Sequence, residues 1–215
     1  MTVASEYVEA RPDLQVIAER VTAQSRVLDL GCGDGLLLRY LMETKQVRAL
    51  GIDLEQEAVI KCVGNGVPVV HGDLNEPLDY ILDNSFDFVI LSCTLQEMVA
   101  PHKLLSEMMR IGRRGVVGVI NFGFVMTRLQ LLLSGRMPMS KTLPHQWFNT
   151  PNIHLGTLRD FKRLCRDLSL KVVETIPLSS GGRAETMPQL WPNLLATNCV
   201  FVIERQDDVK PGKKK

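Results

Sequence analysis

The sequence predicts an α/β fold with a doubly wound, mainly parallel, seven-stranded sheet. Short apolar runs of strand length alternate with segments of helical spacing along most of the 215 residues. This alternation is typical of a parallel sheet with helices on both faces. A glycine-rich turn follows the first apolar run. Later apolar runs end at, or are closely followed by, Asp53, Asp73 and Ser92. In such a sheet these positions meet at one edge, where ligands bind.

The seven expected strands are short and mostly apolar. The fourth is almost wholly apolar and is expected to be central, whereas the third contains Pro68, which favours an edge because proline cannot donate to a ladder. The last two are expected to form an antiparallel pair at one edge. The strands are expected at Arg26–Leu30, Arg48–Asp53, Val67–His71, Phe86–Ser92, Gly115–Asn121, Leu170–Ile176 and Thr197–Glu204.

Helical spacing of apolar residues places the helices between these strands. Pro12 suits the first turn of the first helix, and Gly64-Asn65-Gly66 suits a helix C-terminus. The helices are expected at Pro12–Ala23, Leu36 to about Lys45, Glu55–Val63, Pro101–Ile111 and Leu158–Leu168. Residues 1–11 are polar and expected to be loose. We expect one domain over residues 1–205 and a disordered basic tail over 206–215.

A segment of about 35 residues after Asn121 interrupts the alternation. Phe122–Leu133 is apolar on almost every side, and Met137–Asn152 is rich in proline, methionine and aromatic residues. A helix that is apolar all round is either buried or covered. The segment Phe122–Leu133 can therefore be plain core. Alternatively, it can be a lid or a partner surface, which the aromatic pair Trp147-Phe148 would support.

The composition excludes several classes of protein. The net charge is +1, which favours neither nucleic acid nor an anionic membrane as the partner. The first residues lack a signal-peptide pattern, and no apolar stretch is long enough to span a bilayer. The five cysteines are scattered without a C-x-x-C pair, which argues against a zinc site and against a disulfide framework. We expect a cytoplasmic protein without a metal site.

The turn after the first strand reads Asp29-Leu-Gly31-Cys-Gly33-Asp34-Gly35. Glycines without a Cβ let the backbone approach a ligand closely. A dinucleotide site has G-x-G-x-x-G, but Leu36 occupies the place of the third glycine. Carboxylates at Asp29 and Asp34 are also unfavourable beside a pyrophosphate. The turn therefore favours a positively charged ligand without phosphate, and it disfavours a dinucleotide oxidoreductase.

These residues resemble the class I S-adenosylmethionine-dependent methyltransferases over residues 26–121. The resemblance implies the Rossmann-like fold of those enzymes and S-adenosylmethionine, or S-adenosylhomocysteine, as the cofactor. It implies that Asp53 holds the ribose hydroxyls, that Asp73 meets the adenine amino group, and that Asp29 lies near the ammonium group. Carboxylates are suitable acceptors for all three donors. The expected cofactor-binding residues are Asp29, Gly31, Cys32, Gly33, Gly35, Asp53, Leu54, Asp73, Leu74 and Ser92.

Four stretches also resemble the methionine biosynthesis protein MetW family. They are Arg26–Gly35, Gly51–Leu54, Leu91–Gln96 and Trp147–His154. The resemblance covers nearly the whole chain, including residues 122–156, and implies a partner, a homoserine O-acyltransferase. Our first hypothesis is an S-adenosylmethionine-binding, methyltransferase-like protein that supports this acyltransferase. The second is an active small-molecule methyltransferase, because positioning supplies much of the rate enhancement even without an assigned base.

Several of these residues also have a purely structural interpretation. Asp53 can serve as a helix N-cap, and Asp73 can stabilise its own turn. Cys32 and Cys93 are expected to be small buried residues, because no basic neighbour favours a thiolate.

No catalytic residue is assigned from the sequence. Glu97 can be a general base or a solvated charge, and His145 and His154 can face a substrate or lie on the surface. No Asn/Asp-Pro-Pro-aromatic motif follows the fourth strand, which disfavours a nucleic-acid or protein amino-methyltransferase of that type.

Overall fold

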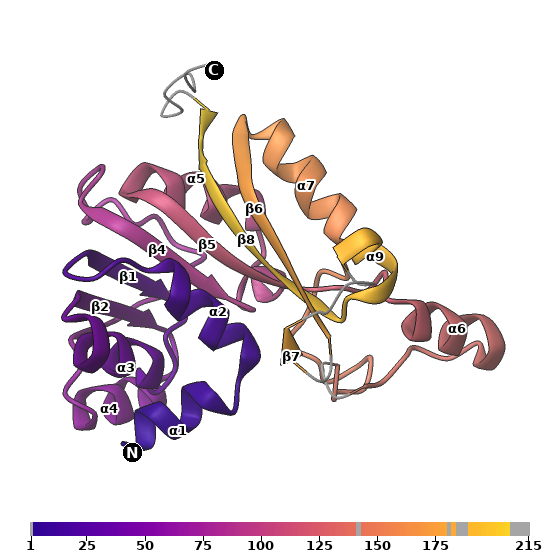
Figure 1. Cartoon of the computed structure of the whole chain (residues 1–215), viewed down its shortest axis with the longest axis horizontal. Helices are drawn as coiled ribbons and strands as arrows, with labels where there is room; N and C mark the ends of the chain where they lie inside the picture. The colour runs from indigo at the N-terminus through magenta and orange to yellow at the C-terminus, as the bar shows by residue number, and fades with distance from the viewer. Residues whose placement is uncertain (1, 141–142, 180–181, 184–188, 207–215) are drawn as a thin grey trace.

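A computed structural model describes residues 2–140, 143–179, 182–183 and 189–206. The described residues form one sheet of eight strands in the order β3-β2-β1-β4-β5-β8-β6-β7 (Figure 1). The strands are β1 Arg26–Leu30, β2 Arg48–Asp53, β3 Val69–His71, β4 Phe86–Ser92, β5 Gly112–Ile120, β6 Leu170–Ser179, β7 Gly182–Arg183 and β8 Asn198–Arg205.

The predicted sheet is confirmed. β1 to β5 are parallel, and β8 lies antiparallel between β5 and β6. All seven expected strands are present, and the two-residue β7 extends the sheet beyond β6. β3 lies at the opposite edge and begins after Pro68. The predicted fold class is therefore correct, with one short additional strand.

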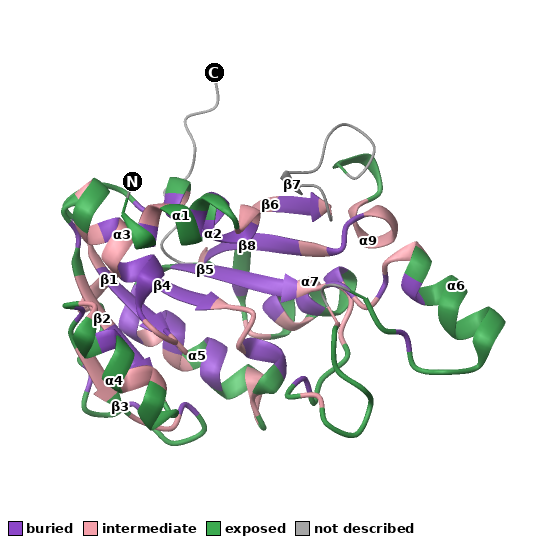
Figure 2. Ribbon diagram, turned by 90° about the horizontal axis from the view of Figure 1, so that it is seen from below, coloured by how far each residue is buried: buried purple, intermediate pink, exposed green. Residues whose placement is uncertain are grey.

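Helices cover both faces of the sheet because side chains alternate along each strand. On β4, Phe88 and Ile90 pack with α1 to α4, whereas Val89 and Leu91 pack with α5 and α7 (Figure 2). The helices are α1 Val3–Glu9, α2 Pro12–Arg20, α3 Leu36–Lys45, α4 Gln56–Gly64, the 3-10 turn η1 Leu95–Glu97, α5 Pro101–Ile111, α6 Val125–Ser134, α7 Leu158–Asp167 and α9 Pro192–Leu195. Among the described residues, no helix has the length and apolar character needed to cross a membrane.

The expectation that residues 1–11 are loose is wrong. Val3–Glu9 is helical, with Thr2 as the N-cap that accepts the Ser5 N–H at 3.3 Å. Ala4 and Val8, four residues apart, form the buried side of this helix. Thr2 also donates to the Glu43 carboxylate of α3 at 2.9 Å. Two small apolar residues in a polar stretch were thus enough to dock the helix. Most of the expected disordered tail, residues 207–215, lies outside the described residues.

The interpretation of Phe122–Leu133 as plain core is also wrong. α6 projects from the body of the molecule and is mostly exposed (Figures 1 and 2). Leu132 is 78% exposed and Leu133 81% exposed, whereas the buried residue within α6 is Thr127. The alternative interpretation, a lid or partner surface, therefore remains for this segment.

Substituting Val8 with alanine should destabilise the protein. Val8 is 1% exposed, so the change deletes buried methyl groups and leaves a cavity that costs about 2 kcal/mol of unfolding free energy. Val3→Ala in the same helix is the matched control, because Val3 is 70% exposed and its loss should cost less than about 0.5 kcal/mol. Urea denaturation of both variants measures the difference. Equal stabilities would mean that α1 is not docked in solution.

Candidate functional site

The glycine turn between β1 and α3 is bound to the end of β2. The Ile52 carbonyl accepts the N–H groups of Gly31 at 2.8 Å and of Cys32 at 3.1 Å. The Asp53 carboxylate accepts the Gly33 N–H at 2.7 Å. These three hydrogen bonds hold the turn at the carboxyl edge of the sheet, where ligands bind in doubly wound folds.

The glycines of the turn differ in what a side chain would meet. A Cβ on Gly31 would lie 2.6 Å from Oγ1 of Thr94, and one on Gly35 would lie 2.5 Å from Sγ of Cys62. A Cβ on Gly33 would meet nothing within 4 Å, although its φ of +57° still favours glycine. Gly31 and Gly35 therefore allow close packing, whereas Gly33 leaves open space.

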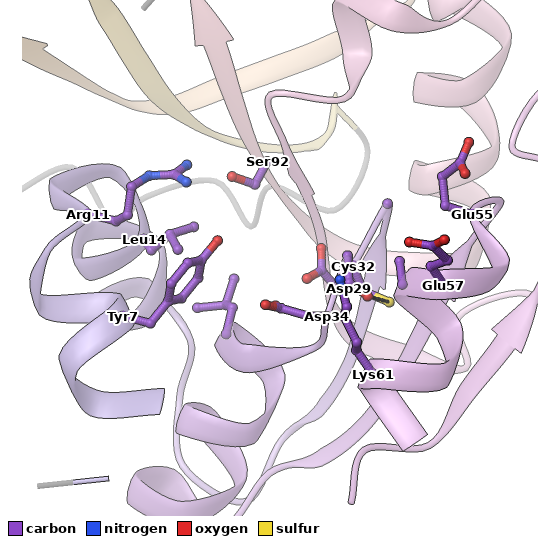
Figure 3. A pocket seen from close by; sticks show the side chains of 14 residues that line it. Tyr7, Arg11, Leu14, Asp29, Cys32, Asp34, Glu55, Glu57, Lys61 and Ser92 are labelled. Atoms are coloured by element: carbon purple, nitrogen blue, oxygen red, sulfur yellow. Dashed lines mark hydrogen bonds between the residues drawn. The ribbon is translucent and has the colours of Figure 1, made fainter. Parts of the chain in front are cut away.

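That open space belongs to a cavity of about 500 Å³, within the range of small-molecule sites. Tyr7 and Arg11 lie on one side of it and Glu55 and Glu57 on the other, with Asp29 between them (Figure 3). The full lining is Tyr7, Arg11, Leu14, Asp29, Gly31, Cys32, Gly33, Asp34, Leu37, Glu55, Glu57, Ala58, Lys61 and Ser92.

Asp29 is the most unusual group of the cavity. Asp29 is 3% exposed, and its Oδ1 atom has no hydrogen-bond partner among the described residues. Burial, with a further contribution from the charge of Asp53, raises the pKa of Asp29 to about 8. A buried polar atom without a partner is costly. An amine or ammonium group of a ligand would supply the missing donor.

Asp53 uses both carboxylate oxygens within the protein. Oδ2 accepts the Gly33 N–H, and Oδ1 accepts the Glu55 N–H at 3.0 Å. The N-cap residue of α4 is Glu55, so Asp53 shapes the turn before the helix and does not cap it. Each oxygen keeps a second lone pair for a ligand hydroxyl. Holding the turn and accepting from a ligand are therefore compatible for this side chain.

Five of the ten residues expected from the sequence line the cavity. They are Asp29, Gly31, Cys32, Gly33 and Ser92. The other five are not part of the lining: Gly35, Asp53, Leu54, Asp73 and Leu74. Of these, Leu54 is 53% exposed and Leu74 is buried against the apolar cluster of α5.

Asp73 lies at the strand end next to Asp53. The Asp53 carbonyl accepts the Gly72 N–H at 2.9 Å, which places the residues after β2 and β3 side by side. The Asp73 Oδ1 atom accepts from the backbone and side-chain N–H groups of Asn75, at 2.8 and 2.9 Å. Asp73 thus stabilises its own turn, as its structural interpretation predicts, and it occupies the edge that the cofactor hypothesis requires.

Sequence reasoning missed the contribution of the N-terminal helices. Tyr7, Arg11 and Leu14 form one wall of the cavity. The Arg11 guanidinium pairs with the Asp13 carboxylate through bonds of 2.9 and 2.6 Å, which hold it in place. Burial raises the pKa of Tyr7, while Arg11 lowers it. The spacing of Ala4 and Val8 was the signal that could have revealed this wall.

Of the two cysteines expected to be small buried residues, Cys32 is buried, whereas Cys93 is only partly buried. Burial and the neighbouring Asp29 raise the pKa of Cys32, and burial raises the pKa of Cys93 to about 11. All five cysteines are free. Their raised pKa values disfavour both as nucleophiles, because thiolates are the reactive form.

The segment after β4 connects the site to residues 143–156. Gln96 is buried, and its amide exchanges hydrogen bonds with the backbone of Ile120 and donates to the His154 carbonyl at 3.2 Å. Burial and the charge of Asp53 raise the pKa of the neighbouring Glu97, whereas His145 lowers it. Both histidines are exposed. In the described parts of the chain, no group of three or more His, Cys, Asp or Glu side chains could hold a metal ion.

Comparisons with solved structures show the same fold. An S-adenosylmethionine dependent methyltransferase from Mesorhizobium loti matches with a TM-score of 0.69 and 15% identity, over 92% of this chain and 100% of that one. A SAM dependent methyltransferase from Archaeoglobus fulgidus matches with a TM-score of 0.66 and 16% identity, over 93% of this chain and 94% of that one. At these identities the likeness shows the fold alone.

Sequence comparison identifies the family. A curated protein of Rhodopirellula baltica, the "Bifunctional methionine biosynthesis protein MetXA/MetW", is 33% identical over 206 residues. The match covers 91% of this chain but 33% of the relative, so the chain spans about a third of that protein's length. The sequence model of the methionine biosynthesis protein MetW matches residues 11–203. The chain belongs to the methionine biosynthesis protein MetW family.

Proposed function

We propose that this chain binds S-adenosylmethionine, or S-adenosylhomocysteine, at the glycine turn and supports a homoserine O-acyltransferase in methionine biosynthesis. The observation that carries the partnership is the bifunctional relative, which joins a MetXA part and a MetW part in one protein. Two parts that are joined in one chain stay close to each other. We infer that the corresponding separate proteins form a complex. The acyltransferase would correspond to the MetXA part.

The residues of the cavity fit the proposed cofactor. Asp29 would accept from the ammonium group, and the Arg11 guanidinium would face the carboxylate of the methionyl part. Carboxylates dominate the lining, with Asp34, Glu55 and Glu57 beside Asp29. They suit a cofactor with a sulfonium and an ammonium group, and they disfavour phosphates.

The remaining expected residues would complete the nucleoside part of the site. Asp53 would accept from the ribose hydroxyls, and Asp73 with Leu74 would contact the adenine. Leu54 follows Asp53 at the exposed edge, and Ser92 lies at the end of β4, on the neighbouring side of β1. Because S-adenosylmethionine is made from methionine, occupancy of this site would report the supply of the pathway's end product. We further propose that residues 1–205 act as one methyltransferase-like domain.

A second candidate is a small-molecule methyltransferase in its own right. Glu97 favours it, because it follows β4 at the carboxyl edge of the sheet, and burial and the charge of Asp53 raise its pKa, which is a property of a general base. Radiolabelled S-adenosylmethionine with a panel of thiol, carboxylate and amine acceptors tests this candidate. Absence of transfer to every acceptor, despite measured cofactor binding, would reject it.

The partnership is tested with the purified acyltransferase. We expect the two proteins to elute together in gel filtration, and acyltransferase activity to be higher with this chain than without it. Adding S-adenosylmethionine should change that activity, if occupancy of the site is the signal. No complex and unchanged activity would reject the proposed function.

Substituting Gly33 with valine should abolish most cofactor binding. The side chain would enter the open space beside the turn, so we expect affinity for S-adenosylmethionine to fall roughly 100-fold, about 2.7 kcal/mol. Isothermal titration calorimetry measures this loss. Gly135→Val is the matched control, because Gly135 also has a positive φ, of +63°, and open space around its Cβ but lies outside the cavity. Equal affinities for the two variants would contradict the assignment of the cavity.

Replacing Asp29 with asparagine should change the pH dependence of stability. A carboxyl group with a raised pKa is protonated more in the folded than in the unfolded chain between about pH 4 and 8. The free energy of unfolding of the wild type should therefore fall, relative to Asp29→Asn, by up to about 1.4 kcal/mol per pH unit across this window.

Chemical denaturation of both proteins without ligand, at pH 5, 6, 7 and 8, measures this difference. Asp167→Asn serves as the control, since its side chain is 67% exposed on α7. Parallel stability curves for the wild type and Asp29→Asn would show that Asp29 ionises normally in the empty protein.

A further inference from the structure

We propose that α6 and the pocket between α6, α7 and α9 form the surface on which the acyltransferase docks, through a segment with apolar and acidic side chains. This inference rests on the proposed function and locates the contact. We call the surface the α6 face. It consists of the exposed apolar residues of α6 and the pocket beside Trp191.

The α6 face exposes large apolar side chains that a folded chain normally buries. Leu132 and Leu133 are about four-fifths exposed, and Trp191 is 68% exposed. Several large exposed apolar side chains on one helix mark an interaction site, and tryptophan is enriched among the residues that dominate binding energy. The α6 helix lies at the far end of the molecule, clear of the sheet (Figure 1).

A pocket of about 500 Å³ lies at the base of α6. Arg128 comes from α6, Arg159 and Lys162 come from α7, and Trp191 and Pro192 come from the start of α9. Such a hollow accepts a side chain that projects from a partner, the usual arrangement of an interface anchor. A flat bilayer surface offers no projecting group to fill it, so the pocket favours a protein partner.

The charged side chains that line the pocket of the α6 face are all positive. Between Glu107 and Asp160 the sequence contains no acidic residue, although it contains several arginines. Asp160 is engaged in the cap of α7, where its carboxylate accepts from the backbone and hydroxyl of Thr157 at 3.0 and 2.7 Å. The arginines and Lys162 at the pocket would therefore be complementary in charge to an acidic segment of the partner.

The same charge disfavours a second copy of this chain. In a two-fold dimer the same patch meets itself, so Arg128, Arg159 and Lys162 of one copy would approach their equivalents. Like charges across an interface are costly. The acyltransferase is therefore the occupant that we propose.

The α6 face has a rigid base. Asn121 is 1% exposed, and its side-chain amide donates to the Ala196 carbonyl at 2.7 Å and to the Asn193 carbonyl at 3.2 Å. Its Oδ1 atom accepts the Gly123 N–H at 3.0 Å. These bonds join the start of the α6 segment to α9, so the pocket exists before binding. A preformed site loses less conformational entropy when it binds.

The α6 face also adjoins the edge that carries the cofactor cavity. α6 follows the carboxyl end of β5, and β5 is parallel to β4 and β1. Gln96, four residues after Ser92, holds the backbone of His154. The segment between α6 and α7 is thus anchored at the carboxyl edge, beside the end of β4.

Binding of the full chain to the purified acyltransferase tests this inference by isothermal titration calorimetry. We expect Leu132→Glu and Trp191→Ala each to weaken binding at least about 30-fold, as losses of central interface residues do. Arg159→Glu should weaken binding as well, and its effect should shrink at high salt. Leu82→Glu is the control, because Leu82 is 77% exposed and precedes the amino end of β4, whereas α6 follows the carboxyl end of β5. The binding of this variant should equal that of the wild type.

The outcomes separate this inference from the proposed function. Circular dichroism and S-adenosylmethionine affinity verify that each variant is folded. If the wild type binds the acyltransferase and all variants bind equally well, the α6 face is not the docking surface, but the partnership stands. If the wild type does not bind at all, the proposed function fails and this inference fails with it.

Two further results would assign the α6 face to another occupant and overturn the inference. One is a wild-type dimer in light scattering that Leu132→Glu converts to a monomer, while acyltransferase binding is unchanged. The other is co-sedimentation of the wild-type protein with vesicles of phosphatidylserine and phosphatidylcholine. In that case Leu132→Glu would abolish co-sedimentation and leave acyltransferase binding unchanged.

Discussion

The hydrogen bonds between the glycine turn and the end of β2 set the geometry of the whole candidate site. The Ile52 carbonyl and the Asp53 carboxylate together receive three consecutive N–H groups of the turn. Because these bonds pull the turn against β2, the backbone at Gly33 is left facing open space, and Asp29 lies at the bottom of the cavity. The packing of Gly31 and Gly35 follows from the same constraint, since both contact neighbouring side chains too closely to carry a Cβ. The turn is therefore a rigid frame, and the ligand has to fit it.

That frame holds a group that is unfavourable in the empty protein. A buried carboxyl group reduces stability when one of its oxygens has no partner, as is the case for Asp29 Oδ1 within the described residues, and burial raises the pKa of this group to about 8. Proteins retain such groups at functional sites, where a ligand supplies what is missing. The acidic lining extends the same preference across the cavity. Electrostatics thus selects the chemical class of ligand, whereas the fold alone, which many proteins with different activities share, does not select a reaction.

The carboxyl edge of the sheet has two parts of different chemical character, which match the two tasks that we propose. Around β1, β2 and β4 it forms an open cavity with more acidic than basic side chains in its lining, and after β5 it extends into residues 122–140 and 143–156, which are mostly exposed and contain no acidic residue. Gln96 and Asn121, both buried, hold the junctions through hydrogen bonds to backbone carbonyls. The two parts are opposite in charge and in polarity. A cationic cofactor and an acidic partner can therefore be bound by one chain without competing for the same surface.

The sequence by itself determined the strand order along the chain, the glycine turn and the acidic residues at the strand ends, because local periodicity and the rules of parallel sheets specify them. It could not show that Asp53 accepts a hydrogen bond from Gly33, twenty residues away, or that Asp29 Oδ1 has no partner in the described parts of the chain. It also did not assign Tyr7 and Arg11 to the site, and it did not decide whether Phe122–Leu133 is buried core or an exposed surface. These features depend on contacts between distant segments, which local pattern does not encode. Tertiary structure decided them: α1 docks on α3 through two small buried residues, while α6, far more apolar, is left mostly exposed by the described part of the chain.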